Sequence, residues 1–278
     1  PFHRDCASGV LRVTVALTGS MSLCVHKLFD HEDRLTPSAG NSHLELTYEA
    51  RFKARLARLV WRLYGPFQWQ WISRAYLSRS GLRCLQIGCG LNPIPGWLNT
   101  DLLPHKPGVA YLDATRPLPL PDASFDYIYS EHLIEHLDYE DGRKLIFECA
   151  RVLKRGGKLR IATPDLQFLI DLYANSQLSE TQRRYIEFEY RRYMPRYETR
   201  QKAVVFNNFM HAWRHRFVYD EDTLRELLRK AHFNRILRYR VGQSDDATLR
   251  SLEHHGAVIS EEFNALETMC LEATRNST

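Results

Sequence analysis

The sequence predicts an α/β protein in which helices flank a doubly wound, mostly parallel sheet. Three observations carry this prediction. Short apolar segments alternate with helical ones from residue 81 onward, which is typical of a parallel sheet. Several of these segments end on a glycine or a carboxylate. The chain has 278 residues, 44% hydrophobic and 26% charged, which is enough to bury a full core.

Seven apolar segments, each bounded by turn residues, are expected to form strands. They are residues 83–87, 97–100, 109–112, 125–129, 158–162, 235–241 and 268–273. A helix is expected over residues 139–154, and the Arg-Gly-Gly sequence at 155–157 is expected to stop it. A second helix is expected over 220–231, with Asp220 as its N-cap.

We expect three parts along the chain. Residues 1–43 are predicted to be a poorly ordered or non-native lead-in, because the first methionine is Met21 and residues 26–43 are polar and rich in turn residues. Residues 44–80 are predicted to form a basic amphipathic helical segment. The main domain is expected at 81–278, with a helical cap inserted at about 166–218.

The basic segment places arginines on one helical face and apolar side chains on another. The arginines are Arg51, Arg55, Arg58 and Arg62, and the apolar residues are Phe52, Leu56, Leu59 and Leu63. The Gly-Pro pair at 65–66 is expected to interrupt the helix. Two interpretations stay open: a helix packed on the domain with a solvated arginine face, or peripheral membrane contact through residues 48–64.

The composition favours one cellular compartment and argues against two kinds of protein, a membrane-spanning one and a nucleic-acid binder. The six cysteines lie far apart without a C-x-x-C pair, which favours a reducing, cytoplasmic compartment. The longest apolar stretch near the start, residues 10–25, is broken by Arg12 and is too short to span a bilayer. The formal charge is +5 and the pI about 8.9, which argues against a dedicated nucleic-acid binder. The oligomeric state is not indicated.

A glycine turn follows the first predicted strand, at residues 88–90. A pyrophosphate site would need a helix after it, but only six residues separate Gly90 from Trp97, and two of them are prolines. Asp101 and Asp113 end the next two strands, where they are placed to accept from a ribose diol and from an adenine amine. A nucleoside bound without a pyrophosphate points to S-adenosylmethionine.

Several segments, taken in order, resemble motifs of the class I S-adenosylmethionine-dependent methyltransferases. They are CLQIGCG, the two strand-end aspartates, FDYIYSEHLIEHL and ARVLKRGGKLRIATPD. The resemblance covers about residues 82–165 and implies a seven-stranded Rossmann-like sheet whose last strand is antiparallel. PIPGWLNTD, YSEHLIEHLDYED and HRFVYD are most similar to a bacterial subgroup associated with glycan synthesis. The chain departs from the pattern at Gln86, where an acidic residue is usual, and lacks the helix after the glycine turn.

The resemblance implies a methyltransferase domain at 81–278 that methylates a small-molecule or glycan acceptor, at oxygen or nitrogen. The residues expected to contact the cofactor are Gln86, Gly88, Cys89, Gly90, Asp101, Leu102, Asp113, Ala114, Ser130 and Glu131. Candidates for a general base are His132, Asp165 and His215. The polar insertion offers His211, Arg216 and Tyr219 to an acceptor.

Residues 132–136 (HLIEH) also fit the H-x-x-E-H pattern of inverted zinc peptidases. That function requires the motif inside a long helix, with a downstream glutamate as third ligand. Here the motif directly follows a short buried strand, and no third ligand is recognisable, so we expect no metal. Two further alternatives stay open: an S-adenosylmethionine-binding protein without catalysis, and an aminopropyl transferase, for which a clear acidic cluster is missing.

Overall fold

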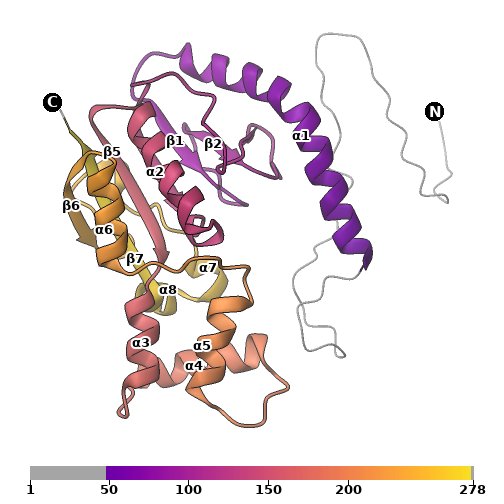
Figure 1. Ribbon diagram of the computed structural model, residues 1–278, viewed down its shortest axis with the longest axis vertical. Helices are drawn as coiled ribbons and strands as arrows, with labels where there is room; N and C mark the ends of the chain where they lie inside the picture. The colour runs from indigo at the N-terminus through magenta and orange to yellow at the C-terminus, as the bar shows by residue number, and fades with distance from the viewer. Residues whose placement is uncertain (1–47, 277–278) are drawn as a thin grey trace. The chain divides into compact units, whose positions relative to one another are not determined.

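The structure, a computed structural model, describes residues 48–276, with side chains from residue 55 onward. The predicted lead-in at 1–43 lies outside the described residues. The helices beyond the sheet, α3 to α5, gather past the end of β5 (Figure 1). Among the described helices, none is both long enough and apolar enough to cross a bilayer.

The central sheet has seven strands in the order β3-β2-β1-β4-β5-β7-β6. Strands β1 to β5 run parallel, and β7 is antiparallel to both of its neighbours. This confirms the predicted fold class. The strands are β1 (Cys84–Ile87), β2 (Leu98–Asp101), β3 (Ala110–Tyr111), β4 (Phe125–Glu131), β5 (Leu153–Pro164), β6 (Phe233–Tyr239) and β7 (Thr268–Arg275).

Two amphipathic helices pack into the main core. Asp138 caps α2 (Tyr139–Val152) by accepting from the Asp141 amide, and Asp220 caps α6 (Glu221–Lys230) by accepting from the Thr223 amide, as expected of N-cap aspartates. The predicted end of α2 at the Arg-Gly-Gly sequence is wrong. The helix ends at Val152, and residues 155–157 lie inside β5, where a side chain at Gly157 would stand 3.0 Å from the Asp126 carbonyl oxygen of β4.

The first helix, α1 (Tyr48–Leu77), runs through Pro66 without a break, so the predicted interruption is also wrong. Gly65 serves close packing here, because a side chain at this position would collide with the ring of Tyr111 in β3. The buried stripe of α1 includes Trp61 and Trp69. The apolar face predicted for packing is instead exposed at Leu59 and Leu63.

The insertion forms a second hydrophobic cluster of its own. Its helices are α3 (Leu166–Ala174), α4 (Glu180–Tyr193) and α5 (Lys202–His211), and they pack with α7 (Gly256–Ile259) and α8 (Glu261–Glu267). Within residues 48–276 the chain also forms two short 3-10 turns, η2 (Ile134–His136) after β4 and η3 (Ala247–Leu249) after β6. Because β7 begins directly after α8, the insertion is tied to the carboxyl end of β5, where Pro164 pairs with Thr268.

Candidate functional site

The order of the strands reverses at β1, which has β2 on one side and β4 on the other. Ile87, the last residue of β1, pairs with Thr100 on one side and Ser130 on the other. The glycine turn, Asp101 and the end of β4 therefore meet at one edge of the sheet. In open α/β sheets ligands bind at this edge, at the point where strand order reverses.

The Asp101 carboxylate holds the glycine turn in place. Its Oδ2 accepts from the Gly90 amide at 2.8 Å, and its Oδ1 accepts from the Leu103 amide at 2.8 Å. The amides of Gly88 and Cys89 both donate to the Thr100 carbonyl at 2.9 Å. An ionised carboxylate has about four acceptor positions, so Asp101 keeps acceptor capacity for a ligand beside the turn.

The two glycines of the turn have different surroundings. Gly88 (φ +73°) packs against the segment after β4, where an added Cβ would stand 2.9 Å from Leu133 Cδ1. Gly90 (φ +51°) has no atom within 4 Å of the same position. Left-handed backbone favours glycine at both sites, and the open side of Gly90 leaves the backbone accessible to a ligand.

Gln86 and Cys89 face inward rather than toward this open side. The Gln86 side chain donates to the Asn92 carbonyl at 3.1 Å and accepts from the Ile94 amide at 3.1 Å. It therefore fastens the loop that follows the glycine turn, and its contact with the cofactor stays a prediction. The Cys89 thiol is buried, and burial raises its pKa to about 12, so it is held as a neutral thiol.

The remaining predicted nucleoside contacts lie along the ends of β2 and β3. Leu102 is exposed and Ala114 half-buried. Asp113 accepts from the Thr115 amide and hydroxyl through Oδ1, and pairs with Arg116 at 3.2 Å through Oδ2. These local bonds fix the orientation of the Asp113 carboxylate at the edge of the sheet.

At the end of β4, Ser130 is buried and its hydroxyl has no hydrogen-bond partner among the described residues. Buried hydroxyls are nearly always bonded to protein, water or ligand, so this oxygen leaves a bonding position for a ligand. Glu131 is engaged differently, since it accepts from the amides of His254 and His255 at 2.8–3.1 Å. It fixes the loop before α7, and its contact with the cofactor stays a prediction.

His132 and Glu135 form a hydrogen-bonded pair directly after β4. His132 Nδ1 lies 3.1 Å from Glu135 Oε1, and Thr163 donates to Glu135 Oε2 at 3.0 Å. Burial is the largest single influence and opposes charge on both groups, but the hydrogen bond between them and the attraction of nearby opposite charges together outweigh it, lowering the pKa of Glu135 and raising that of His132. Glu135 is fully buried, and both of its carboxylate oxygens have a hydrogen-bond partner, His132 for one and Thr163 for the other.

A second pair faces the first. The rings of His132 and His255 lie 3.9 Å apart at an angle of 33°, and His255 Nε2 lies 3.6 Å from Glu267 Oε1. The buried Tyr185 hydroxyl donates to Glu267 at 2.5 Å. His255 and Glu267 had not been predicted, because nothing local marks residues about 120–135 positions after His132 as its neighbours.

The two histidines of the H-x-x-E-H stretch point to different partners. His136 lies in the 3-10 turn η2, which is three residues long, and not in the long helix that a peptidase site requires. Its ring meets that of His215 at 5.2 Å and 63°, whereas His132 contacts His255. His215 Nδ1 lies 2.7 Å from the Phe209 carbonyl oxygen, and burial lowers the pKa of His215.

The other predicted side chains lie elsewhere. Asp165 caps α3 through Oδ1 and pairs with Arg238 at 2.6 Å through Oδ2, and its role as a general base stays a prediction. Tyr219 is fully buried and packed against Gly142 of α2, so it cannot line an acceptor pocket. His211 is exposed at the end of α5, and Arg216 is exposed and 3.6 Å from Asp138.

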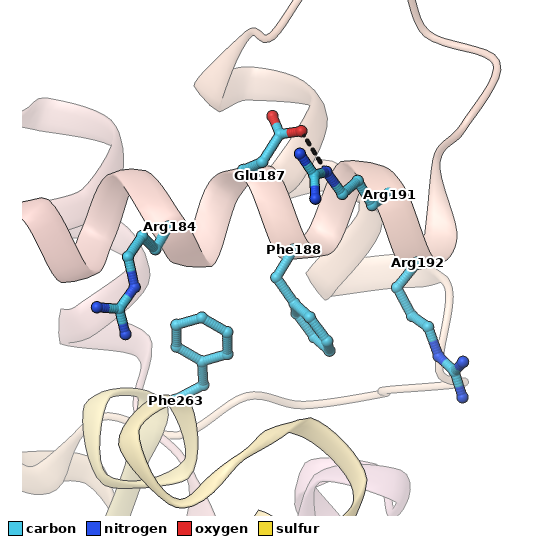
Figure 2. A pocket seen from close by; sticks show the side chains of 6 residues that line it. All are labelled: Arg184, Glu187, Phe188, Arg191, Arg192 and Phe263. Atoms are coloured by element: carbon cyan, nitrogen blue, oxygen red, sulfur yellow. Dashed lines mark hydrogen bonds and ion pairs between the residues drawn. The ribbon is translucent and has the colours of Figure 1, made fainter.

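A depression of about 540 Å³ lies on the insertion, separate from the glycine turn. Figure 2 shows its lining from α4 together with Phe263 of α8, and the ion pair of Glu187 with Arg191 at 2.7 Å. Arg184 forms an ion pair with Glu262. Two of the three arginines that line the depression, Arg184 and Arg191, are therefore already paired with carboxylates.

Comparison with known proteins supports a methyltransferase domain. A family model described as a methyltransferase domain matches residues 101–161, which run from the end of β2 into β5. Two Mycobacterium tuberculosis proteins, each described as a probable S-adenosylmethionine-dependent methyltransferase, are 48% identical over 48 residues. That match spans 17% of this chain and 17% of each relative. The family match is a similarity over the middle of the sheet, and the chain spans about a sixth of the length of these relatives.

Two solved structures are also similar. An S-adenosylmethionine-dependent methyltransferase from Mesorhizobium loti has 18% identity and a TM-score of 0.45, covering 75% of this chain and 97% of its own. A phosphoethanolamine N-methyltransferase of Haemonchus contortus, in complex with S-adenosyl-L-methionine, has 16% identity and a TM-score of 0.42, covering 76% of this chain and 56% of its own.

Proposed function

We propose that this chain transfers a methyl group from S-adenosylmethionine to an oxygen or nitrogen atom of a small-molecule or glycan acceptor. The observation that carries the proposal is the edge formed by the glycine turn, Asp101 and Ser130, within a domain that matches methyltransferases. Asp101 would accept from the ribose, Gly90 would lie against the ligand, and the Ser130 hydroxyl would face it. No phosphate-binding helix is needed.

When bound, S-adenosylmethionine supplies a sulfonium methyl group: the methyl–sulfur bond breaks with its electron pair left on sulfur, and the acceptor's lone pair bonds the methyl carbon. The protein has to align the acceptor and take up the proton that it loses. The geometry favours His132 for the proton, because Glu135 orients its ring through Nδ1. The weak contact of Nε2 with Thr268, at 3.4 Å, is the one that an acceptor would replace.

The support for a glycan acceptor is the resemblance of three sequence segments to glycan-associated methyltransferases. The polar surroundings agree with an acceptor that carries hydroxyl or amine groups, since four histidines and two carboxylates converge after β4. A protein that binds the cofactor without catalysis would keep the Asp101 edge and would have no use for the Glu135–His132 pair.

Calorimetry is expected to show binding of S-adenosylmethionine and of S-adenosylhomocysteine by the folded protein. Extracts incubated with the methyl-labelled cofactor are then expected to yield a labelled small molecule or glycan only when the protein is present. Absence of binding to either compound in a folded sample would refute the proposal. Binding without transfer to any extract component would favour the non-catalytic alternative, and labelling only by decarboxylated cofactor that carries the label in its aminopropyl chain would favour aminopropyl transfer.

We further propose that α1 contacts an anionic membrane surface. Four apolar side chains spaced four residues apart are exposed on this helix: Leu59 at 53%, Leu63 at 67%, Phe67 at 70% and Trp71 at 81%. Arg55, Arg58 and Arg62 are exposed in the same turns. An apolar stripe flanked by arginines is complementary to a bilayer with acidic headgroups.

The protein is expected to co-float with vesicles that contain phosphatidylglycerol and to stay unbound with pure phosphatidylcholine. Replacing Phe67 and Trp71 with glutamate should weaken binding more than tenfold, because burial of each aromatic side chain is worth about 1.5–3 kcal/mol. Leu237→Glu, on the exposed side of β6, is the matched control and should bind normally. If the parent, the Phe67 and Trp71 variant and Leu237→Glu all bound the anionic vesicles equally well, α1 would have no role in membrane binding.

A further inference from the structure

The H-x-x-E-H stretch acquires a third metal-ligand candidate through tertiary structure. The ligand atoms of Glu135, His136 and His215 all lie within 4.8 Å of one another. We infer that these three residues form a binding site for one divalent transition-metal cation of the zinc class. This corrects the expectation, drawn from the sequence, that the stretch has no third ligand.

The backbone fixes His215 beside the stretch. The amides of Arg216 and Phe217 both donate to the Glu135 carbonyl, at 2.7 and 3.2 Å. This bond pair joins the chain after α5 to η2, although about 80 residues separate the two in sequence. Ligands from different elements are thus held by main-chain contacts and do not depend on flexible side chains alone.

The ring orientations suit a shared metal ion. A metal bound to an imidazole nitrogen lies in the plane of the ring, so two histidines sharing an ion must have intersecting planes. The rings of His136 and His215 meet at 63°. A bond from His215 Nδ1 to the Phe209 carbonyl leaves Nε2 as the ligand atom, which is the outer hydrogen bond usual for metal-binding histidines.

A second cluster, His132, His255 and Glu267, has ligand atoms equally close together, but its geometry is less suitable. The His132 and His255 rings lie 3.9 Å apart and are tilted by only 33°, closer to parallel than the 63° between His136 and His215. Both nitrogens of His132 also have partners, Glu135 and Thr268, and an imidazole nitrogen has only one lone pair. Glu135 is likewise bonded to His132 and Thr163, but each carboxylate oxygen keeps a second acceptor position. This cluster is better explained as hydrogen-bonded pairs than as a metal site.

The donor set indicates which cation fits. Two imidazoles and one carboxylate are a set that zinc and related cations accept, with a fourth position open to water or substrate. Zinc bonds of about 2.0–2.1 Å place tetrahedral ligands roughly 3.4 Å apart, so small side-chain rotations would close the site. His136 is accessible to solvent, which gives an ion a route of entry.

The site lies next to the predicted cofactor edge. Leu133, between β4 and η2, packs on Gly88 of the glycine turn, so the ion would stand on the acceptor side of that edge. If the proposed methyl transfer is correct, the open coordination position would hold an acceptor oxygen or nitrogen and make it easier to deprotonate. That role rests on the proposed function, whereas the metal site rests on geometry alone.

The test is a titration of the chelator-treated full chain with Co²⁺ alone, followed by visible absorption, and then competition with Zn²⁺. We expect one Co²⁺ per chain, ligand-field bands of a low-coordinate site, and displacement by Zn²⁺. His136→Ala and His215→Ala should each weaken Co²⁺ binding at least tenfold. His254→Ala, at an exposed neighbouring histidine, is the control and should bind as the parent does.

His255→Ala separates the two clusters. Loss of Co²⁺ binding in this variant, with normal binding in His215→Ala, would place the ion at the other cluster and overturn the inference. Absence of stoichiometric binding by the folded parent would also overturn it. Thermal melting confirms that each variant is folded, and His136→Ala keeps the test decisive if His215→Ala unfolds. S-adenosylmethionine binding is measured separately by calorimetry, so failure of the metal site and failure of the proposed function are distinguishable.

Discussion

Asp101→Ala is expected to weaken S-adenosylmethionine binding by more than tenfold. The carboxylate would bond the ribose, and its removal also frees the Gly90 and Leu103 amides that it now holds. Charge-assisted hydrogen bonds contribute about 1.5–3 kcal/mol, and each 1.4 kcal/mol corresponds to about a tenfold change in affinity. The measurement is calorimetry on variant and parent at equal ionic strength.

Asp171→Ala is the matched control, because it removes an exposed carboxylate from α3 without touching the cofactor edge. Its affinity should equal that of the parent. Asp101→Asn retains an acceptor oxygen but not the charge, so it should bind with intermediate affinity. A folded Asp101→Ala protein with unchanged affinity would show that the ribose lies elsewhere.

The largest expected effect on stability comes from Arg160, in β5. Its side chain is fully buried; Nε donates to Glu253 at 2.6 Å and one terminal nitrogen donates to Glu272 at 2.5 Å. Arg160→Ala leaves two buried carboxylates without their cation, and loss of one partner of a buried ion pair costs about 3–5 kcal/mol. Urea unfolding is expected to show a loss of this size in the free energy of unfolding.

Arg229→Ala provides the comparison. Arg229 is 60% exposed and lies 3.9 Å from Glu226, and exposed pairs of this kind contribute about 0–1 kcal/mol. Arg160→Lys keeps the charge but lacks the planar guanidinium that reaches both glutamates. Its free energy of unfolding should therefore lie between those of Arg160→Ala and Arg229→Ala. Arg160 with Glu253 and Glu272 forms a buried triad that joins β5 to β7 and to the loop after β6. An Arg160→Ala protein as stable as Arg229→Ala would show that this triad does not stabilise the fold.

The sheet could be predicted because its signals are local. Apolar runs that end on glycine or aspartate located β1, β2 and β3, and the cap of α6 at Asp220 was confirmed by its bond to Thr223. Errors occurred where a local signal was outweighed by packing. Gly65 and Pro66 predicted the end of a helix, yet α1 continues through both. Gly65 has no side chain, and this lets α1 pack closely against Tyr111.

The sequence by itself determined the fold class, the glycine turn and the strand-end carboxylates, since each depends on residues that are neighbours in the chain. Only the tertiary structure decided which side chains converge after β4. On a regular helix the H-x-x-E-H spacing would place His132 and His136 on one face, but the positive φ of His132 (+45°) and the short turn η2 direct them apart. His132 meets His255 and His136 meets His215, because loop paths and main-chain bonds between distant segments set those contacts, and no local pattern in the sequence records them.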